Sequence, residues 1–129
     1  MKIEHIALWV QDLEKMRAFY EQYFDAISNE KYVNPAKEFS SYFLSFASGA
    51  RLEIMHMTSV VANKNSIEPQ AMGLIHFAMS TGSKEKVDQL TEKLRVDGYK
   101  VIGEPRNTGD GYYESVVLDP ENNRIEITV

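Results

Sequence analysis

The feature that most constrains this chain is an internal repeat. The apolar run at residues 3–10 contains His5, and the apolar run at residues 73–80 contains His76, with alanine two positions after each histidine, at Ala7 and Ala78. A repeated segment indicates that one supersecondary unit occurs twice. We therefore expect the 129 residues to fold as two related halves.

Each of these runs is followed, at the same offset, by a predicted amphipathic helix. Asp12 and Ser83 have the same separation in sequence as His5 and His76, and both are residue types favoured at a helix N-cap. After each of them, apolar residues recur at helical spacing along one stripe. The stripe residues are Leu13, Met16, Phe19, Tyr20 and Tyr23 in the first half and Val87, Leu90 and Leu94 in the second. We expect each helix to pack on a sheet.

Strand-like segments complete both halves. They lie at residues 39–47, 51–57, 112–118 and 124–129, with a weaker strand before each pair. Each half then has the order β-α-β-β-β, which predicts an α+β fold of two tandem modules. We place the modules at residues 1–57 and 73–129, joined by a linker at 58–72. One helix covers only one face of such a small sheet.

The uncovered face of each sheet is predicted to carry a histidine and a glutamate. Side chains alternate across a strand, so the apolar neighbours of His5 and His76 face the helix while the histidines point away. The same alternation in the last strand of each half places Glu53 and Glu126 on the free face.

These four side chains suggest a metal site. A single strand histidine is more often an ordinary hydrogen-bonded residue, but here the His–Glu pattern recurs at equivalent positions of a repeat. Two carboxylates enclosed together cost several kcal/mol unless a positive charge compensates them. Two imidazoles and two carboxylates suit zinc, nickel, cobalt, manganese or ferrous iron. We predict one divalent ion held by His5, Glu53, His76 and Glu126.

Composition excludes several other functions. The chain has no cysteine, which excludes disulfides, thiolate metal sites and cysteine nucleophiles. A formal net charge of −5 has the wrong sign for binding phosphates, so we expect no nucleic-acid partner. Residues 1–5 carry charges unlike those of a secretory signal, and no run approaches the roughly 20 apolar residues that cross a bilayer. We expect no membrane partner and a cytoplasmic location.

Five blocks of the sequence resemble the vicinal oxygen chelate superfamily (glyoxalase/bleomycin resistance/dioxygenase), and within it the glyoxalase I (lactoylglutathione lyase) group. They are HIALWV from His5, FY at 19–20, LEI around Glu53, GLIHFA at 73–78 and DPENNRIE at 119–126. The resemblance spans the whole chain. It implies paired modules that form a cup-shaped mixed sheet around one divalent metal. Zinc and nickel are the preferred metals, and cobalt, manganese and iron are the alternatives. It also implies the same four ligands.

The resemblance implies a reaction as well. A metal with open positions can hold two adjacent substrate oxygens and stabilise the charge formed when a proton leaves the carbon beside a carbonyl. In the family a ligand glutamate acts as the base, so we predict Glu126 as the catalytic residue, with Glu53 as the equivalent catalytic residue of the first half. This chemistry belongs to a lyase or isomerase of small α-oxygenated carbonyl compounds.

Five side chains are predicted to bind the substrate. Arg51 and Arg124 lie two residues before the glutamates, on the same face, and can receive an anionic group. The predicted walls of the site are Trp9, Met55 and Tyr113. Glutathione-using family members carry an arginine where this chain has Trp9. A contact of such an arginine with a glutathione carboxylate is therefore expected to be missing here.

Other functions on the same fold stay open. They are a metal-dependent epimerase of acyl-CoA compounds, a ring-cleaving dioxygenase, an antibiotic-modifying transferase and a non-catalytic bleomycin-type binding protein. The dioxygenases and transferases have no counterpart of Glu53, and the bleomycin-binding proteins have lost the ligands. Family members usually form dimers. We expect a homodimer, with the site formed within one chain or across two.

Overall fold

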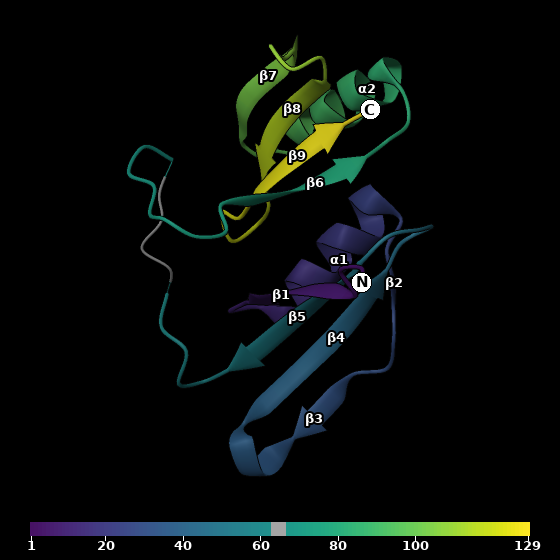
Figure 1. Cartoon of the computed structure of the whole chain (residues 1–129). Helices are drawn as coiled ribbons and strands as arrows, with labels where there is room; N and C mark the ends of the chain where they lie inside the picture. The colour runs from purple at the N-terminus through teal and green to yellow at the C-terminus, as the bar shows by residue number, and fades with distance from the viewer. Residues whose placement is uncertain (63–66) are drawn as a thin grey trace. The chain divides into compact units, whose positions relative to one another are not determined.

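The computed structural model describes residues 1–62 and 67–129 and divides into two compact units, Met1–Asn63 and Lys64–Val129 (Figure 1). Each unit holds one α-helix and one mixed sheet, which confirms the α+β fold of tandem β-α-β-β-β modules. The predicted linker at 58–72 includes residues 63–66, which lie outside the described residues.

The first unit builds its sheet in the order β1-β5-β4-β2, with β3 also paired to β4. Strand β1 runs parallel to β5, and the other pairs are antiparallel. Helix α1 contacts β4 and β5. The elements are β1 (His5–Trp9), α1 (Leu13–Phe24), β2 (Ile27–Ser28), β3 (Tyr32–Asn34), the 3-10 turn η1 (Pro35–Lys37), β4 (Phe39–Ser45) and β5 (Arg51–Met57).

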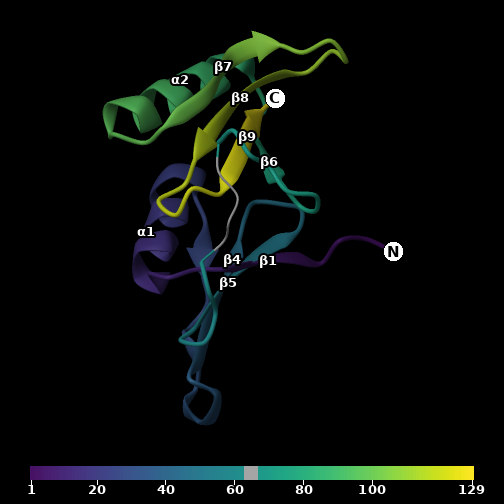
Figure 2. The ribbon, with the colours of Figure 1, turned by 90° about the vertical axis from the view of Figure 1, so that its left-hand side faces the viewer.

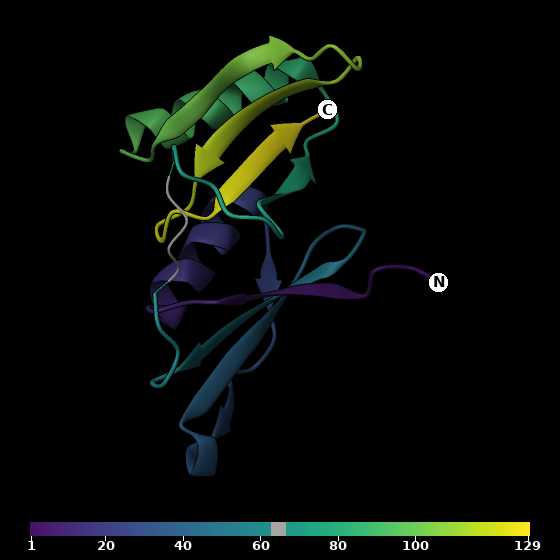
Figure 3. The same ribbon diagram turned by 60° about the vertical axis from the view of Figure 1, so that its left-hand side comes forward.

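The second unit repeats this topology, with the sheet order β6-β9-β8-β7. Its first strand again lies at the sheet edge, parallel to the last strand. Figure 3 shows β7 and β8 in front of helix α2, which contacts β7, β8 and β9. The elements are β6 (His76–Ser80), α2 (Lys84–Val96), β7 (Val101–Asn107), β8 (Tyr113–Leu118) and β9 (Arg124–Thr128).

Both helices begin at the predicted N-caps. The Asp12 carboxylate accepts a hydrogen bond from the Lys15 backbone N–H at 3.0 Å, and the Ser83 hydroxyl accepts one from Lys86 at 3.3 Å. The predicted stripe of α1 is buried throughout. In α2, Val87 and Leu94 are buried as expected, but Leu90 is only half-buried.

The third buried residue of α2 is polar, which apolar periodicity could not predict. The Thr91 hydroxyl donates to the Val87 carbonyl oxygen at 2.6 Å and lies 2.6 Å from the Ser115 hydroxyl on β8. Because Thr91 uses its proton on Val87, the Ser115 hydroxyl donates to Thr91. The two buried hydroxyls therefore satisfy each other.

The two weaker strands are irregular, and each has a local cause. Strands β2 and β3 pair with successive parts of β4, so they form one strand interrupted at Asn29. There the Asn29 side-chain oxygen accepts from the Phe43 backbone N–H at 2.8 Å, in place of a backbone carbonyl. Figures 1 and 2 both show the β3–η1–β4 hairpin extending from the rest of its unit. Strand β7 contains Pro105 and register shifts, which its edge position tolerates.

The predicted alternation of faces is present in both last strands. Leu52 and Ile54 on β5 are buried, as are Ile125 and Ile127 on β9, whereas the residues between them are half-buried. Within residues 1–62 and 67–129, neither helix is long and apolar enough to span a membrane.

The turn between β8 and β9 depends on Asp119, which is 3 % exposed. Its Oδ1 accepts from the backbone N–H groups of Glu121 and Asn123, both at 2.9 Å, and its Oδ2 accepts from Asn123 Nδ2 at 2.8 Å. We expect Asp119→Ala to lower the free energy of unfolding by about 1–3 kcal/mol, because donors in the turn lose their acceptor. Urea unfolding followed by circular dichroism measures this change. The control is Asp110→Ala, at an exposed turn position. Equal stability of the two variants would contradict the assigned role of Asp119.

Candidate metal site

The strand register explains why a histidine meets a glutamate in each unit. Along the parallel pair β1/β5, His5 lies opposite Arg51, and Ala7 lies opposite Glu53. Along β6/β9, His76 lies opposite Arg124, and Ala78 lies opposite Glu126. Paired residues share a face of the sheet, so each histidine is the diagonal neighbour of its glutamate.

The contact atoms are the same in both units. His5 Nε2 lies 3.9 Å from Glu53 Oε2, and His76 Nε2 lies 3.2 Å from Glu126 Oε2. The histidine side chains are 40 % and 41 % exposed, against 15 % and 20 % for the glutamates. Both pairs therefore sit on the face away from the helix, with the carboxylates set deeper than the imidazoles.

The donor sets fit half of a divalent metal site each. Two ligand atoms bonded to one tetrahedral zinc at about 2.1 Å lie roughly 3.4 Å apart. The His76–Glu126 contact is close to this spacing, whereas the His5 and Glu53 contact atoms would have to move slightly closer together. An imidazole nitrogen with a carboxylate oxygen suits zinc and its first-row neighbours. Among residues 1–62 and 67–129, the structure contains no group of three or more His, Asp or Glu side chains that could hold a metal ion.

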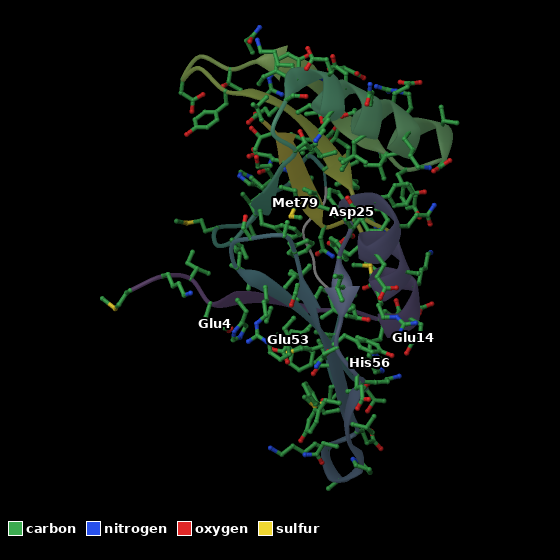
Figure 4. The ribbon with its side chains drawn as sticks, turned by 90° about the vertical axis from the view of Figure 1, so that its right-hand side faces the viewer. Glu4, Glu14, Asp25, Glu53, His56 and Met79 are labelled. Atoms are coloured by element: carbon green, nitrogen blue, oxygen red, sulfur yellow. The ribbon has the colours of Figure 1, made fainter. Side chains whose placement is uncertain are left out.

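Glu4 is a residue that sequence reasoning missed. His5 Nδ1 lies 2.5 Å from Glu4 Oε2, and the guanidinium of Arg51 donates to Glu4 Oε1, from Nε at 2.9 Å and also from Nη2. These hydrogen bonds, first that of His5 and then that of Arg51, hold the pKa of the Glu4 carboxyl below its ordinary value. In Figure 4, Glu4 and Glu53 both lie beside β1, whereas Glu14 lies on α1. Strict alternation could not find Glu4, because it precedes the first residue of the strand.

The His76–Glu126 pair lines a pocket of ≈ 550 Å³ in the second unit. Arg106 and Arg124 also line this pocket, so it combines the two candidate ligands with two cations. Arg106 Nη2 lies 3.3 Å from Glu114, and Arg124 Nη2 donates to the backbone carbonyl of Ile67 at 2.6 Å. Arg106 is a second residue that the sequence analysis did not select.

The predicted substrate-binding residues of the first unit are close to its His–Glu pair. Trp9 is 43 % exposed, lies opposite Met55 in the register and meets the Phe39 ring edge-on at 6.0 Å. Arg51, besides its bonds to Glu4, lies over the Phe43 ring at 4.2 Å. Its charge is therefore already engaged within the unit.

Tyr113 does not join the His76–Glu126 pair. Its hydroxyl donates to Asp88 Oδ1 at 2.7 Å, and Lys84 Nζ lies 4.9 Å from the ring centroid; both partners are on α2. The hydrogen bond to Asp88 raises the pKa of the Tyr113 phenol. Tyr113 thus contacts the helix that covers the opposite face of the sheet.

His56 is separate from both His–Glu pairs. Its Nδ1 lies 3.0 Å from the Val10 carbonyl oxygen, so the ring connects the end of β5 to the chain after β1. Alternation places it on the same side of β5 as the buried Ile54. It is a half-buried structural residue.

Comparisons with known proteins agree with this fold. The chain is 30% identical to the uncharacterized Bacillus subtilis (strain 168) protein YqjT over 132 aligned positions, covering 97% of this chain and 96% of YqjT. The glyoxalase I crystal structure from Zea mays superposes with a TM-score of 0.79 at 22% identity, over 98% of this chain but only 44% of the maize protein. The trypanothione-dependent glyoxalase I of Leishmania major gives a TM-score of 0.78 at 21% identity, over 99% and 86% of the two chains.

The family assignment rests on nearly the whole chain. Residues 2–127 match the family described as Glyoxalase/Bleomycin resistance protein/Dioxygenase superfamily. The structural neighbours share the arrangement of elements at low identity, and YqjT is related along almost its full length. The chain is therefore a member of the glyoxalase/bleomycin resistance/dioxygenase superfamily, the vicinal oxygen chelate superfamily.

Proposed function

We propose that this protein is a metal-dependent lyase or isomerase, similar to lactoylglutathione lyase, that removes a proton from the carbon beside a carbonyl group. The observation that carries the proposal is the recurrence of one His–Glu pair, with the same contact atoms, at equivalent register positions of both units. The recurrent pair supplies two imidazoles and two carboxylates on the free faces of the two sheets, a donor set that suits one divalent ion. We assign this activity to the cytoplasm.

The proposed metal ligands are His5, Glu53, His76 and Glu126, which together would hold one divalent ion. Zinc and nickel are the preferred ions, and cobalt, manganese and iron are the alternatives. When bound, the ion supplies positive charge against the negative charge that develops on the substrate oxygens. The protein's own contribution is to carry two imidazoles and two carboxylates on rigid strands, which fixes their directions.

Glu126 is the proposed base. Its carboxylate is mostly buried and lines the ≈ 550 Å³ pocket beside His76, so a substrate in that pocket can bring its acidic carbon to the carboxylate. Glu53 is the equivalent group of the first unit and is the second candidate for the base. Arg106 and Arg124 line the same pocket and can orient an anionic substrate.

The alternative functions differ in the bond they change. Epimerases of acyl-CoA compounds use the same proton abstraction, whereas dioxygenases and antibiotic-modifying transferases do not need a fourth ligand at Glu53. A binding protein of the bleomycin type needs no ligands. A panel of α-keto hemithioacetals, acyl-CoA epimers and antibiotics separates these classes. Exposed Trp9 in place of arginine favours an α-oxygenated substrate other than the glutathione hemithioacetal.

The metal site can be tested through His76. We expect the purified protein to hold about one divalent ion per chain and His76→Ala to lose most of it, because an imidazole ligand is removed. Elemental analysis after desalting gives the content. His56→Ala is the matched control, since His56 contacts the Val10 carbonyl rather than a glutamate. Stoichiometric metal in the folded His76→Ala protein would exclude His76 as a ligand.

The base can be tested with Glu126→Gln, provided that the metal content of the variant is measured as well. The substitution keeps the size of the side chain but removes a carboxylate ligand and cannot accept the proton, so we expect weaker metal binding and, in the metal-loaded variant, turnover lower by roughly 10²- to 10⁴-fold. Deuterium uptake at the carbon beside the carbonyl, followed by NMR on the best compound of the panel, measures the proton step. Glu92→Gln, an exposed change on α2, should have the parent rate. A parent-like rate in Glu126→Gln would move the base to another residue.

We also propose a homodimer. A module of this size leaves apolar surface exposed, and association of two chains can cover such surface. Ile3 is 68 % exposed and Leu74 is 66 % exposed. The expected scattering mass is twice 14.8 kDa. A mass of 14.8 kDa at working concentration would contradict the dimer.

A further inference from the structure

Glu4 links His5 to Arg51 through both of its carboxylate oxygens. Oε2 lies 2.5 Å from His5 Nδ1, and Oε1 accepts from Arg51 Nε at 2.9 Å. Arg51 is in turn placed by Phe43, whose ring lies 4.2 Å below the guanidinium and meets the His5 ring edge-on at 5.3 Å. The imidazole is therefore held both by a hydrogen bond and by ring packing.

The chemistry of this contact determines the protonation of the ring. A carboxylate can only accept hydrogen bonds, so His5 Nδ1 carries the proton and donates it to Glu4. In the neutral imidazole, Nε2 then keeps its lone pair. Nε2 is the atom that faces Glu53, at 3.9 Å. Carboxylates often orient metal-bound histidines in this way, through the nitrogen that does not bind the metal.

We propose that Glu4 is a positioning residue, which fixes the His5 tautomer and directs Nε2 toward the metal. This inference rests on the proposed function, since it assumes that His5 is a metal ligand. Arg51 belongs to the same arrangement, because it holds Glu4 in place. The role of Arg51 is therefore to orient a carboxylate of the protein, in addition to or instead of an anionic substrate.

The two halves differ in this respect. The residue before His76 is Ile75, a half-buried apolar side chain that cannot accept a hydrogen bond. Arg124, the counterpart of Arg51, donates instead to the Ile67 carbonyl. Within residues 1–62 and 67–129, the repeat therefore duplicates the candidate ligands, while the contact of a preceding glutamate with the histidine ring occurs at His5 alone.

Two measurements on the full chain test the proposal. Long-range ¹H–¹⁵N NMR of the metal-free protein above pH 8 reads which His5 nitrogen is protonated, and competition with a chromophoric chelator gives the zinc affinity. For Glu4→Ala we expect a shift of His5 toward the Nε2-protonated tautomer and a zinc affinity lower by roughly 10- to 100-fold. Glu4→Gln keeps a neutral acceptor and should lie between the two. Glu30→Ala removes the same charge from an exposed position and should match the parent.

The outcomes separate this proposal from the proposed function. An unchanged His5 tautomer in folded Glu4→Ala overturns the positioning role, even if zinc affinity falls, because lost charge alone would then explain the fall. An altered tautomer with unchanged zinc affinity also overturns it. If the parent protein binds no zinc or nickel, the proposed function fails, and the positioning of Nε2 for a metal fails with it. A tautomer that still changes in Glu4→Ala would then show that only the hydrogen bond was correctly assigned.

Discussion

The parallel pairing of the first strand with the last strand is the constraint on which the rest of each unit depends. It places His5 one diagonal step from Glu53, and His76 one diagonal step from Glu126, on the same face of their sheets. The helix covers the opposite face, so apolar residues fill that side while polar groups occupy the free one. A shift of the first strand by one residue in this register would turn its histidine to the other face of the sheet, away from the glutamate.

Much of this arrangement could be predicted from the sequence because it depends on periodicity. Alternation along the strands indicates the faces of the glutamates, and helical spacing with an N-cap predicts both helices. The buried Thr91 was not predictable in the same way, because its burial depends on a hydroxyl partner from β8. The interruption of β2 and β3 depends on the Asn29 amide, which replaces a backbone group.

The candidate site likewise has one part that strand alternation predicts and another part that depends on tertiary contacts. The His–Glu pairs follow from parity, whereas Glu4 lies before the strand, where alternation does not hold. Tyr113 was predicted as a wall of the site from its place in a strand, but its hydroxyl bonds to Asp88 on α2. Which of several plausible partners a long polar side chain reaches is a tertiary question, and strand periodicity contains no information on it.

The parallel pairing also determines when, during folding, the His–Glu pair of a unit can form. Unlike neighbours in a hairpin, His5 and Glu53 lie on the first and last strands of their unit, so they meet only after a long loop has closed around the helix and the intervening strands. Contacts of such high sequence separation carry a large loop-closure entropy and tend to form late in folding. A nascent or partly unfolded module therefore presents one imidazole and one carboxylate far apart, with no chelating advantage over any other surface pair. By this topology, the proposed cation site can form only in modules whose strand order is already complete.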